Sequence, residues 1–225
     1  AMAMGHVILK EFYFPDSGER SAYFDDYARR YTDLPMLVML DEQDTPAGKA
    51  LVPGRYLRAS DLGGEVGAGS NNEWKTLAYD ADGSIVVPNG SIGFRWGDSG
   101  RADEGKWNLE QRAKGAEAQL RLSQILDGHH DEVVGVDFPY FGGVATGGFV
   151  KCDHPEVLTR NIPARRVTLA DGTQALVATV FDLFCANYGL DRGLGGKWVS
   201  NDFNDDSPYT PAWAESITGV PRQQI

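Results

Sequence analysis

Apolar side chains at helical spacing open the chain. Met4, Ile8 and Phe12 recur every three or four residues after Ala1, with Leu9 alongside, so this stretch is predicted to be an amphipathic helix. An uncovered stripe of this kind is an interaction surface or a cause of association. We therefore expect the helices at the two ends either to pack together and leave an apolar patch, or to be more mobile than residues 74 to 183.

A second helix is predicted to begin at a Ser17 or Ser21 cap and to run to about Tyr31. One of its faces carries Phe24, Tyr27, Ala28 and Tyr31. Its solvent-facing side is predicted to hold two i,i+4 ion pairs, Asp25 with Arg29 and Asp26 with Arg30. Pro35 ends this segment, and the apolar run from Met36 to Leu40 predicts a short buried strand.

Turn residues in the rest of the chain predict antiparallel hairpins. Asp82-Gly83 lies between the β-like runs 76–79 and 85–87, and Asp171-Gly172 lies between 167–169 and 175–177. Asp-Gly favours such turns because both residues tolerate the positive φ values that a tight turn needs. Asn89-Gly90 marks a further turn.

The segment between these hairpins has two interpretations. Trp107 and Leu109 alternate with polar residues, as do Leu120 and Leu122, which favours two strands joined through Gly115. An amphipathic helix from Glu104 to Leu126 is the alternative, because Ala, Glu and Gln are good helix formers.

Helical signals return towards the end of the chain. A helix is predicted from Thr179 to Tyr188 with Gly189 after its last turn, and Thr210-Pro211 opens another that reaches Ser216. Pro221 opens a final short turn. Helices at both ends with strands between them predict an α+β fold, in which terminal helices flank a mainly antiparallel β-rich insertion. The side chains expected to be largely buried are Trp74, Leu77, Ile85, Val87, Phe94, Trp96, Val167, Leu169, Leu176, Val180 and Leu183.

Charge and composition narrow the class of protein. Across 225 residues, 32 acidic side chains outnumber 21 basic ones, giving a formal charge of -11. Because an acidic chain repels phosphate backbones, we expect no nucleic-acid partner. The longest apolar runs are far too short to span a bilayer, and the start of the chain lacks the charged and apolar regions of a signal peptide.

The residues that could carry chemistry do not form a recognisable motif. Two cysteines and four histidines are available, but Cys152 with His154 and the adjacent His129-His130 lack the spacing of a metal site. Cys185 lies on the apolar face of its helix and is predicted to be a small core side chain. The acidic pairs Asp25-Asp26, Asp131-Glu132 and Asp205-Asp206 are predicted to be solvated.

Two glycine-rich segments fail as nucleotide sites. The segment 142–148 lacks the Lys and Ser or Thr of a phosphate loop, and Gly193-Leu194-Gly195-Gly196 follows a helix where a dinucleotide fingerprint needs a strand. The chain also has no Gly-x-Ser-x-Gly nucleophile elbow. The residues alone therefore assign no catalytic, cofactor-binding or metal-binding side chain.

Several segments together resemble the alpha subunit of membrane-bound respiratory nitrate reductases, which belong to the molybdopterin oxidoreductases. The most specific run from Pro88 to Gly97 (PNGSIGFRWG) and from Lys106 to Arg112 (KWNLEQR). The other matching segments are 3–9, 27–40, 138–143, 186–190, 209–215 and 217–220. The resemblance covers the whole chain.

This resemblance implies that the chain is an internal fragment of such a subunit. Residues 1–39 would be a helical segment of the parent molybdopterin domain, 40–209 an insertion particular to the nitrate reductase branch, and 210–225 a returning helical segment. The insertion, of about 170 residues, has the size of an independent domain. The stretch Arg30 to Asp33 is expected to pack on its neighbours as a helix C-terminus, with an approach to the cofactor region as the alternative.

The resemblance also implies cofactors and partners for the parent. Its molybdenum would be bound by two molybdopterin guanine dinucleotides, with a 4Fe-4S cluster nearby, and would reduce nitrate to nitrite. The ligands of those groups lie outside the matching segments, so we expect no cofactor in this fragment and no activity from it alone. The partners would be the remainder of the alpha subunit, an iron–sulfur beta subunit and a membrane quinol-oxidising subunit, which would hold the complex at the cytoplasmic side of the membrane.

Two other functions remain open at this point. The chain could be part of a related oxidoreductase that acts on chlorate or selenate or oxidises nitrite, or it could be a free-standing interaction domain. The cofactor ligands of the full-length gene would distinguish them.

Overall fold

A closed β-barrel is the centre of the fold. The computed structural model describes residues 1–45, 48–67, 69–88, 112–113, 116–140 and 156–225. Within these residues the barrel order is β1-β2-β7-β8-β9. The strands are β1 (Leu37–Thr45), β2 (Gly48–Tyr56), β7 (Glu132–Tyr140), β8 (Glu156–Thr168) and β9 (Gln174–Thr179). Their pairing is antiparallel except between β2 and β7, which run parallel where Leu51 lies opposite Val136.

Strand alternation fills the barrel with apolar side chains. Along β8, every second residue from Leu158 to Ala164 is buried, whereas Val157 and Thr159, on either side of Leu158, are exposed. Period-two alternation of this kind places one set of side chains on the covered face. The core cluster of the barrel is Val38, Leu40, Val136, Phe138, Tyr140, Leu158, Ile162, Ala164, Ala178, Leu183, Ala186 and Tyr209.

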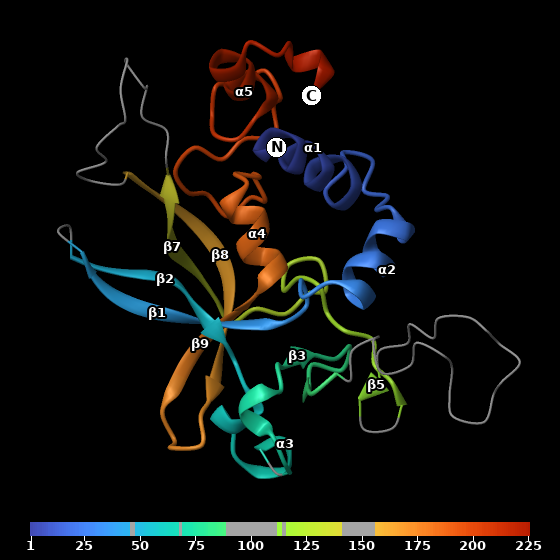
Figure 1. Cartoon of the computed structure of the whole chain (residues 1–225), viewed down its shortest axis with the longest axis vertical. Helices are drawn as coiled ribbons and strands as arrows, with labels where there is room; N and C mark the ends of the chain where they lie inside the picture. The colour runs from blue at the N-terminus through green and yellow to red at the C-terminus, as the bar shows by residue number, and fades with distance from the viewer. Residues whose placement is uncertain (46–47, 68, 89–111, 114–115, 141–155) are drawn as a thin grey trace, which may run out of the picture.

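Helix α4 (Val180–Asn187) lies between the barrel and the outer helices (Figure 1). It starts directly after β9 because Thr179 caps it, its hydroxyl accepting a hydrogen bond from the N–H of Asp182. Its fully buried Phe181 contacts Tyr13 and Phe14 from the first helix. Helix α4 therefore packs on one side against the barrel core and on the other side against the apolar cluster beneath α1.

Three helices form the outer layer. They are α1 (Met2–Tyr13), α2 (Ala22–Tyr31) and α5 (Pro211–Thr218), and α1 lies beside α5 at the end of the molecule where both termini are found (Figure 1). The buried face of α1 is Ala3, His6, Leu9, Lys10 and Tyr13. The Tyr13 hydroxyl donates to the carbonyl of Phe24 at 2.8 Å and so fixes α2 against α1.

Smaller elements close the other end of the barrel around a second cluster that includes Leu37, Leu57, Leu62, Leu77 and Tyr79. These elements are η1 (Ala59–Asp61), α3 (Gly64–Gly67), η2 (Asn72–Trp74), β3 (Ala78–Tyr79), β4 (Ile85–Val86), β5 (Arg112–Ala113) and β6 (Ala116–Glu117), and η4 (Arg222–Gln224) ends the chain.

A buried arginine holds the segment after α4 to the barrel. Arg160 is fully buried on β8, in line with Leu158 and Ile162, and its guanidinium donates to five backbone carbonyls. The accepting residues are Ala186, Asn187, Lys197, Trp198 and Pro208. All five N–H donors of a guanidinium can thus be used, which is what the burial of such a group requires.

Two glycines make room for this arginine. Gly189 has a φ of 77°, and a Cβ built there would lie 2.4 Å from the Pro208 carbonyl oxygen and 2.9 Å from Nη2 of Arg160. Gly196 has a φ of 128°, and its Cβ would lie 2.7 Å from the Arg160 Cα. Any other residue at either position would force the backbone away from the guanidinium.

The structure confirms the α+β class and most local predictions. Ser21 caps α2, Gly83 and Gly172 turn the two Asp-Gly hairpins at positive φ, and Gly189 follows α4. The described residues on either side of Gly115 pair as β5 and β6, so strands and not a helix form there. The second strand does not reach Leu120 and Leu122, because Leu120 makes only an isolated bridge with Asp80. Asn89-Gly90, Trp107 and Leu109 lie outside the described residues.

Several core predictions are wrong or only partly right. Trp74 is 78% exposed, because it ends a one-turn 3-10 helix whose residues are all at the surface. Leu77, Val167 and Leu183 are buried as predicted. The side chains that are only half-buried are Ile85, Val87, Leu169, Leu176 and Val180, and Phe94 and Trp96 lie outside the described residues.

The contrast between a buried and an exposed aromatic side chain can be tested directly. Phe181→Ala should lower the free energy of unfolding by about 3–5 kcal/mol, because it leaves a cavity between α4 and α1. Trp74→Ala is the control and should change it by no more than about 0.5 kcal/mol. Urea unfolding followed by circular dichroism measures both, and equal losses would contradict the placement of these side chains.

Candidate functional site

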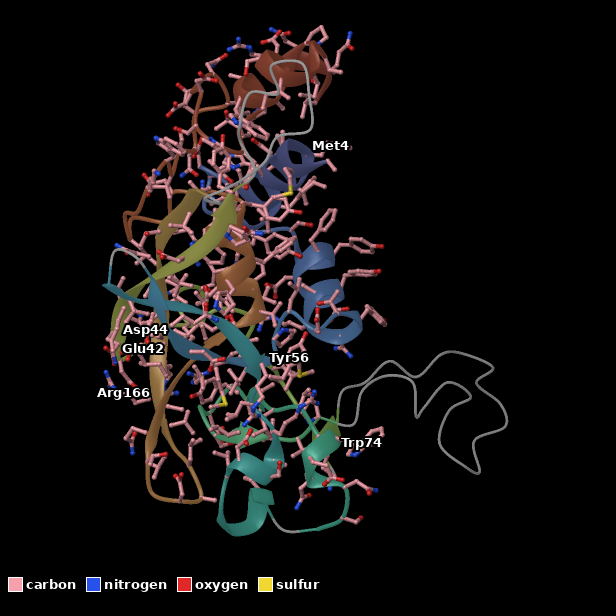
Figure 2. The ribbon with its side chains drawn as sticks, turned by 60° about the vertical axis from the view of Figure 1, so that its left-hand side comes forward. Met4, Glu42, Asp44, Tyr56, Trp74 and Arg166 are labelled. Carbon is pink, nitrogen blue, oxygen red and sulfur yellow. The ribbon has the colours of Figure 1, made fainter. Side chains whose placement is uncertain are left out.

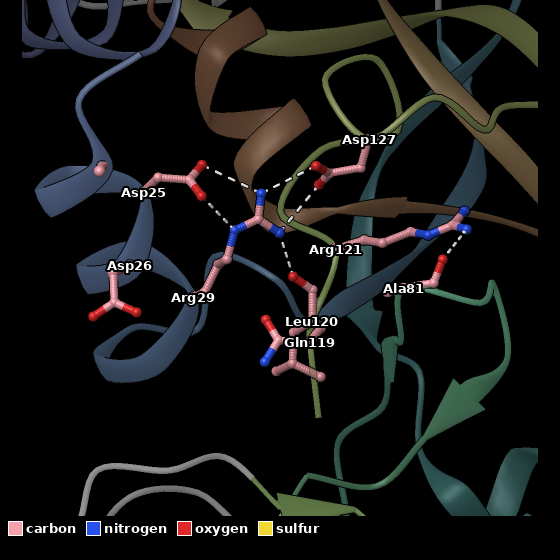
Figure 3. Close-up of a pocket in the computed structure, with 9 residues that line it drawn as sticks. Asp25, Asp26, Arg29, Ala81, Gln119, Leu120, Arg121 and Asp127 are labelled. Carbon is pink, nitrogen blue, oxygen red and sulfur yellow. Dashed lines mark hydrogen bonds and ion pairs between the residues drawn. The ribbon is translucent and has the colours of Figure 1, made fainter. Parts of the chain in front are cut away.

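A pocket of about 460 Å³ lies between α2 and the segment from Gln119 to Asp127. Its lining residues are Ala22, Asp25, Asp26, Arg29, Ala81, Gln119, Leu120, Arg121 and Asp127. Figure 3 shows Asp25 and Arg29 of α2 pointing toward Asp127 on the opposite wall. Charged side chains from both walls line this hollow, which makes it a candidate site.

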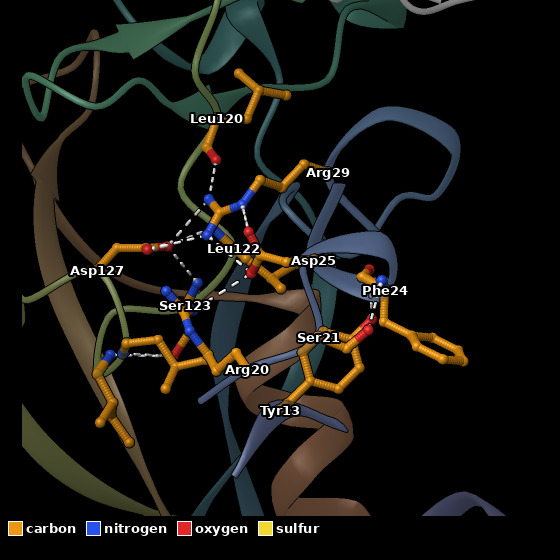
Figure 4. A network of polar contacts seen from close by, with 12 residues as sticks. Tyr13, Arg20, Ser21, Phe24, Asp25, Arg29, Leu120, Leu122, Ser123 and Asp127 are labelled. Carbon is orange, nitrogen blue, oxygen red and sulfur yellow. Dashed lines mark hydrogen bonds and ion pairs between the residues drawn. The ribbon is translucent and has the colours of Figure 1, made fainter. Parts of the chain in front are cut away.

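Arg29 is the centre of the pocket. Its Nε lies 2.7 Å from Oδ2 of Asp25 on the same helix, and its Nη2 lies 3.0 Å from Oδ1 of Asp127 on the opposite wall (Figures 3 and 4). Its Nη1 donates to the carbonyl of Leu120. The guanidinium therefore joins α2 to a segment about a hundred residues away, as charge-assisted hydrogen bonds of this type do well.

Asp127 is held in its charged form by these contacts. Burial raises the pKa of its carboxyl group, but the Arg29 guanidinium and two backbone N–H groups outweigh this and hold the pKa below its usual value. Those N–H groups belong to Leu122, at 2.7 Å, and Ser123, at 3.1 Å. The carboxylate thus caps its own turn and binds α2 at the same time.

The other polar groups of the pocket are engaged in the same way. Nη2 of Arg121 donates to the Ala81 carbonyl at 2.7 Å (Figure 3), and Asp26 pairs with Arg30 along α2. The charged groups at the centre of the pocket bind each other and the backbone. This arrangement indicates that they hold α2 against the segment from Gln119 to Asp127.

A second polar centre lies under the pocket and is fully buried. The Asp182 carboxylate on α4 accepts from the Ser123 hydroxyl at 2.7 Å, from the Gln124 N–H at 2.8 Å and from Arg192 at 2.9 Å. Burial raises the pKa of this carboxyl group, with Arg192 and the hydrogen bonds acting against it. The carboxylate is not exposed to solvent. Its hydrogen bonds from Ser123 and Gln124 fix this segment on α4.

His6 is a third buried polar group, on the inner face of α1. Its Nδ1 lies 2.7 Å from the carbonyl of Tyr188, whereas its Nε2 has no hydrogen-bond partner among the described residues. Burial lowers the pKa of the imidazole, the hydrogen bond to Tyr188 acts against this, and the charge of Arg160 lowers the pKa further. The ring therefore stays neutral at neutral pH and anchors α1 to the end of α4.

The residues that the sequence singled out are scattered. His129 and His130 are exposed in a turn, Cys185 is fully buried in the cluster beneath α1, and Gly196 contacts Arg160. The described side chains hold no grouping of three or more His, Cys, Asp or Glu residues that could bind a metal ion. Cys152, His154 and the segment 142–148 lie outside the described residues.

Predictions for the acidic pairs need one correction. Asp25 and Arg29 form the expected i,i+4 pair, but their side chains are only 23% and 19% exposed and face the pocket, so they are not on the solvent side. The tertiary partner Asp127 decides this. Asp26 is exposed, as predicted for a solvated pair. In the stretch Arg30 to Asp33, the Thr32 hydroxyl donates to the Ala28 carbonyl at 2.6 Å and Asp33 accepts from Tyr56, so these two residues pack locally.

The sequence analysis missed Arg160, His6 and Asp182. A signal for Arg160 exists, since it alternates with Leu158 and Ile162 and therefore faces the core of any strand built from them. His6 and Lys10 are separated by one helical turn, but two polar residues in a helix ordinarily indicate its wet face. Nothing near Asp182 in sequence indicates a buried carboxylate.

The barrel, the buried Arg160 and the networks of charged side chains define an α+β module. The polar groups described above bind other groups of the same chain. No helix within the described residues is long and apolar enough to cross a membrane. No family model matches the chain. Comparison with individual proteins is more informative.

The chain aligns along its whole length with nitrate reductase alpha chains. It is 52% identical over 225 residues to the respiratory nitrate reductase 2 alpha chain of Escherichia coli and covers 17% of that protein. It is 39% identical over 226 residues to the nitrate reductase alpha subunit of Mycobacterium tuberculosis and 36% identical over 228 residues to the alpha chain of Bacillus subtilis, covering 16% of each. The chain therefore corresponds to a segment of the respiratory nitrate reductase alpha chains, which confirms the resemblance seen in its sequence.

The first prediction from this site concerns Arg29. Arg29→Ala leaves the Asp127 carboxylate half-buried without its cation, so it should lower the free energy of unfolding by about 2–3 kcal/mol. Arg30→Ala, one residue along the same helix, removes a more exposed ion pair and should cost under about 0.5 kcal/mol. Urea denaturation of both variants measures the difference, and indistinguishable midpoints would show that the junction adds nothing to stability.

The second prediction concerns pH. Because His6 has a lowered pKa in the folded chain, the unfolded chain binds one more proton below the ordinary value of 6.5. Stability should therefore decline as pH falls from about 7 to 5, by up to about 1.4 kcal/mol per pH unit from this group. His6→Asn retains an amide donor for the Tyr188 carbonyl but cannot titrate, so it should remove this part of the slope. His129→Gln, in an exposed turn, is the control, and the idea fails if its slope changes as much as that of His6→Asn.

Proposed function

We propose that this chain is a structural portion of the catalytic subunit of a respiratory nitrate reductase, in which nitrate is reduced to nitrite at a molybdenum centre. The observation that carries the proposal is the identity of 52% along all 225 residues to an alpha chain of which this chain makes up 17%. The activity belongs to the whole subunit. The part of it represented here would act as a scaffold.

The use of charged side chains supports a scaffold role. Arg29, Arg160 and Asp182 bind backbone groups or oppositely charged side chains at 2.7–3.0 Å and join segments that are far apart in the chain. Groups committed to such contacts cannot move to bind a substrate without breaking the fold. Their role is to hold α4, the outer helices and the barrel together.

The cofactors implied by the family do not fit the described residues. A 4Fe-4S cluster requires cysteine thiolates, whereas Cys185 is fully buried in an apolar cluster and burial raises the pKa of its thiol well above the ordinary value. The described residues also bring together no three His, Cys, Asp or Glu side chains. We therefore derive no chemical step through either group for the described residues, and Cys152 and His154 lie outside them.

The partners and location of the parent follow from the same proposal. The relatives are named as alpha chains of respiratory enzymes, which implies further subunits in their complexes. We propose an iron–sulfur beta subunit and a membrane quinol-oxidising subunit as those partners, with this chain on the cytoplasmic side. A formal charge of -11 argues against a nucleic-acid partner.

We also propose the division of the chain into residues 1–39, 40–209 and 210–225, in which the middle part is an insertion between two segments of the molybdopterin domain. The contact between α1 and α5 supports this, because it brings the two flanking segments together at one end. Strand β1 would then be shared, since Leu37–Thr45 runs across the first boundary.

The proposal is tested on the full-length protein. The complete gene, expressed with its partner subunits, should yield an enzyme that oxidises reduced viologen dyes with nitrate, and the 225-residue chain alone should show no turnover. Arg29→Ala in the full-length protein should reduce the yield of assembled enzyme but leave the turnover per bound molybdenum within about two-fold, as expected for a residue that affects folding and not chemistry. If the full-length enzyme uses chlorate or selenate but not nitrate, the proposed substrate is wrong. Turnover by the isolated chain would overturn the scaffold role.

A further inference from the structure

The outer surface of α1 and α2 carries a continuous row of exposed apolar and aromatic side chains. We call it the aromatic strip and define it as Met4, Ile8, Phe12, Tyr23, Tyr27 and Tyr31, with the half-buried Phe24 between the two helices. Met4 is 55% exposed and Tyr23 is 72% exposed, which is unusual for side chains of this size.

Ring contacts make the strip continuous from one helix to the next. Phe12 of α1 stacks on Phe24 of α2 with ring centroids 4.3 Å apart. From there Tyr23 contacts Tyr27 at 6.3 Å, and Tyr27 contacts Tyr31 at 5.2 Å. On α1, the strip residues are spaced by four positions and so lie on one face.

The strip is not a poorly packed part of the chain's own core. The inner faces of the same helices are already covered, since Leu9, Tyr13 and Ala28 are at most 6% exposed and pack against Phe181 and Cys185 of α4. The two helices therefore have one face that the chain buries and a second apolar face that it leaves uncovered. Helices with two apolar faces are ordinarily placed between two packed layers.

The aromatic strip lies on the side of the molecule formed by the outer helices. Figure 2 shows Met4 on the side of the outer helices, whereas Glu42, Asp44 and Arg166 lie on the opposite side with the barrel. Near that polar side Arg166 pairs with Glu132 at 2.7 Å. The aromatic strip is therefore set apart from these charged side chains of the barrel, where single apolar side chains such as Val133 are also exposed.

Two observations identify what covers the strip. The chain makes up only 17% of the alpha chains it matches, so most of such a polypeptide lies outside this structure. Both termini lie at the end of the molecule formed by α1 and α5, next to the strip (Figure 1). A polypeptide that continues from these ends begins beside the strip.

We propose that the aromatic strip is the surface on which the remainder of the parent alpha chain packs. This inference rests on the proposed function only in taking the chain as a segment of a longer subunit. The covering surface is apolar, with backbone carbonyls or other acceptors placed for the tyrosine hydroxyl groups, because aromatic anchors with one polar atom suit such interfaces. The Asp26–Arg30 pair lies on the same helix and sets the polar rim.

The test is hydroxyl-radical footprinting of the full-length alpha chain in its assembled complex, compared with the 225-residue chain. Met4 and Tyr23 should be oxidised at least about ten-fold more slowly in the full-length chain, because buried side chains are shielded from the reagent. Equal oxidation rates in the two proteins would overturn the proposal. Activity is not read, so a failure here is distinct from a failure of the proposed nitrate reductase function.

Two other occupants would give different footprints and would also overturn the proposal. If a second copy covers the strip, the protection is lost when the full-length protein is diluted until sedimentation shows only monomers. If a lipid surface covers it, protection appears only after phosphatidylglycerol vesicles are added. Protection that persists in the dilute, vesicle-free complex supports packing by the same polypeptide.

Matched substitutions provide a second readout. Ile8→Glu, at a side chain that is 40% exposed, should leave the unfolding midpoint of the isolated chain unchanged but increase the rate of limited proteolysis of the full-length chain by about ten-fold or more. Val133→Glu, on β7 and 42% exposed, is the control and should affect neither protein. Equal effects of the two substitutions on the full-length chain, or loss of stability of the isolated chain with Ile8→Glu, would contradict the proposal.

Discussion

The burial of one guanidinium constrains most of this structure. Arg160 faces the barrel core, where a charged group is stable only if all its donors are satisfied, and it meets this requirement with five backbone carbonyls and no carboxylate. Two of those carbonyls, of Ala186 and Asn187, belong to the last turn of α4, where a cation also interacts favourably with the helix dipole. Burial lowers the pKa of Arg160 to about 10, which leaves it charged at neutral pH. The segment from Gly189 to Pro208 has to follow the guanidinium, and it leads directly to α5.

The positions of the outer helices depend on the contacts around Arg160. His6 binds the Tyr188 carbonyl next to the carbonyls that Arg160 uses, so α1 is fixed to the same helix end. Arg29 and Asp127 then tie α2 to the turn that Asp182 holds on α4. A series of buried polar contacts thus runs from the barrel to the outer layer, and each contact fixes a helix whose inner face is apolar. The outward aromatic strip is a consequence, because orienting Leu9 and Tyr13 inward turns Met4, Ile8 and Phe12 outward.

The similarity to nitrate reductase alpha chains relates this arrangement to the proposed function. The chain covers 17% of the alpha chain it matches, so in the proposed parent subunit it would also present a surface to the rest of the polypeptide. The polar contacts hold the described elements together, and the aromatic strip is the proposed contact surface. The half-buried Asp127 and the buried Asp182 bind other groups of the same chain, so their contacts hold the module together.

The sequence by itself determined much of the local structure: a serine cap at Ser17 or Ser21, Asp82-Gly83 and Asp171-Gly172 as turns, and the α+β class. These signals act within a few residues, so they do not depend on the rest of the fold. The sequence also indicated the family, because whole segments of it resemble nitrate reductase alpha subunits. The tertiary structure alone decided which face of α1 is buried, that Arg29 faces a pocket and not solvent, that Trp74 is exposed and that Arg160 is the polar centre of the core. The physical reason is that burial depends on partners such as Asp127 and Pro208, which lie tens of residues away and are brought close only when the barrel closes.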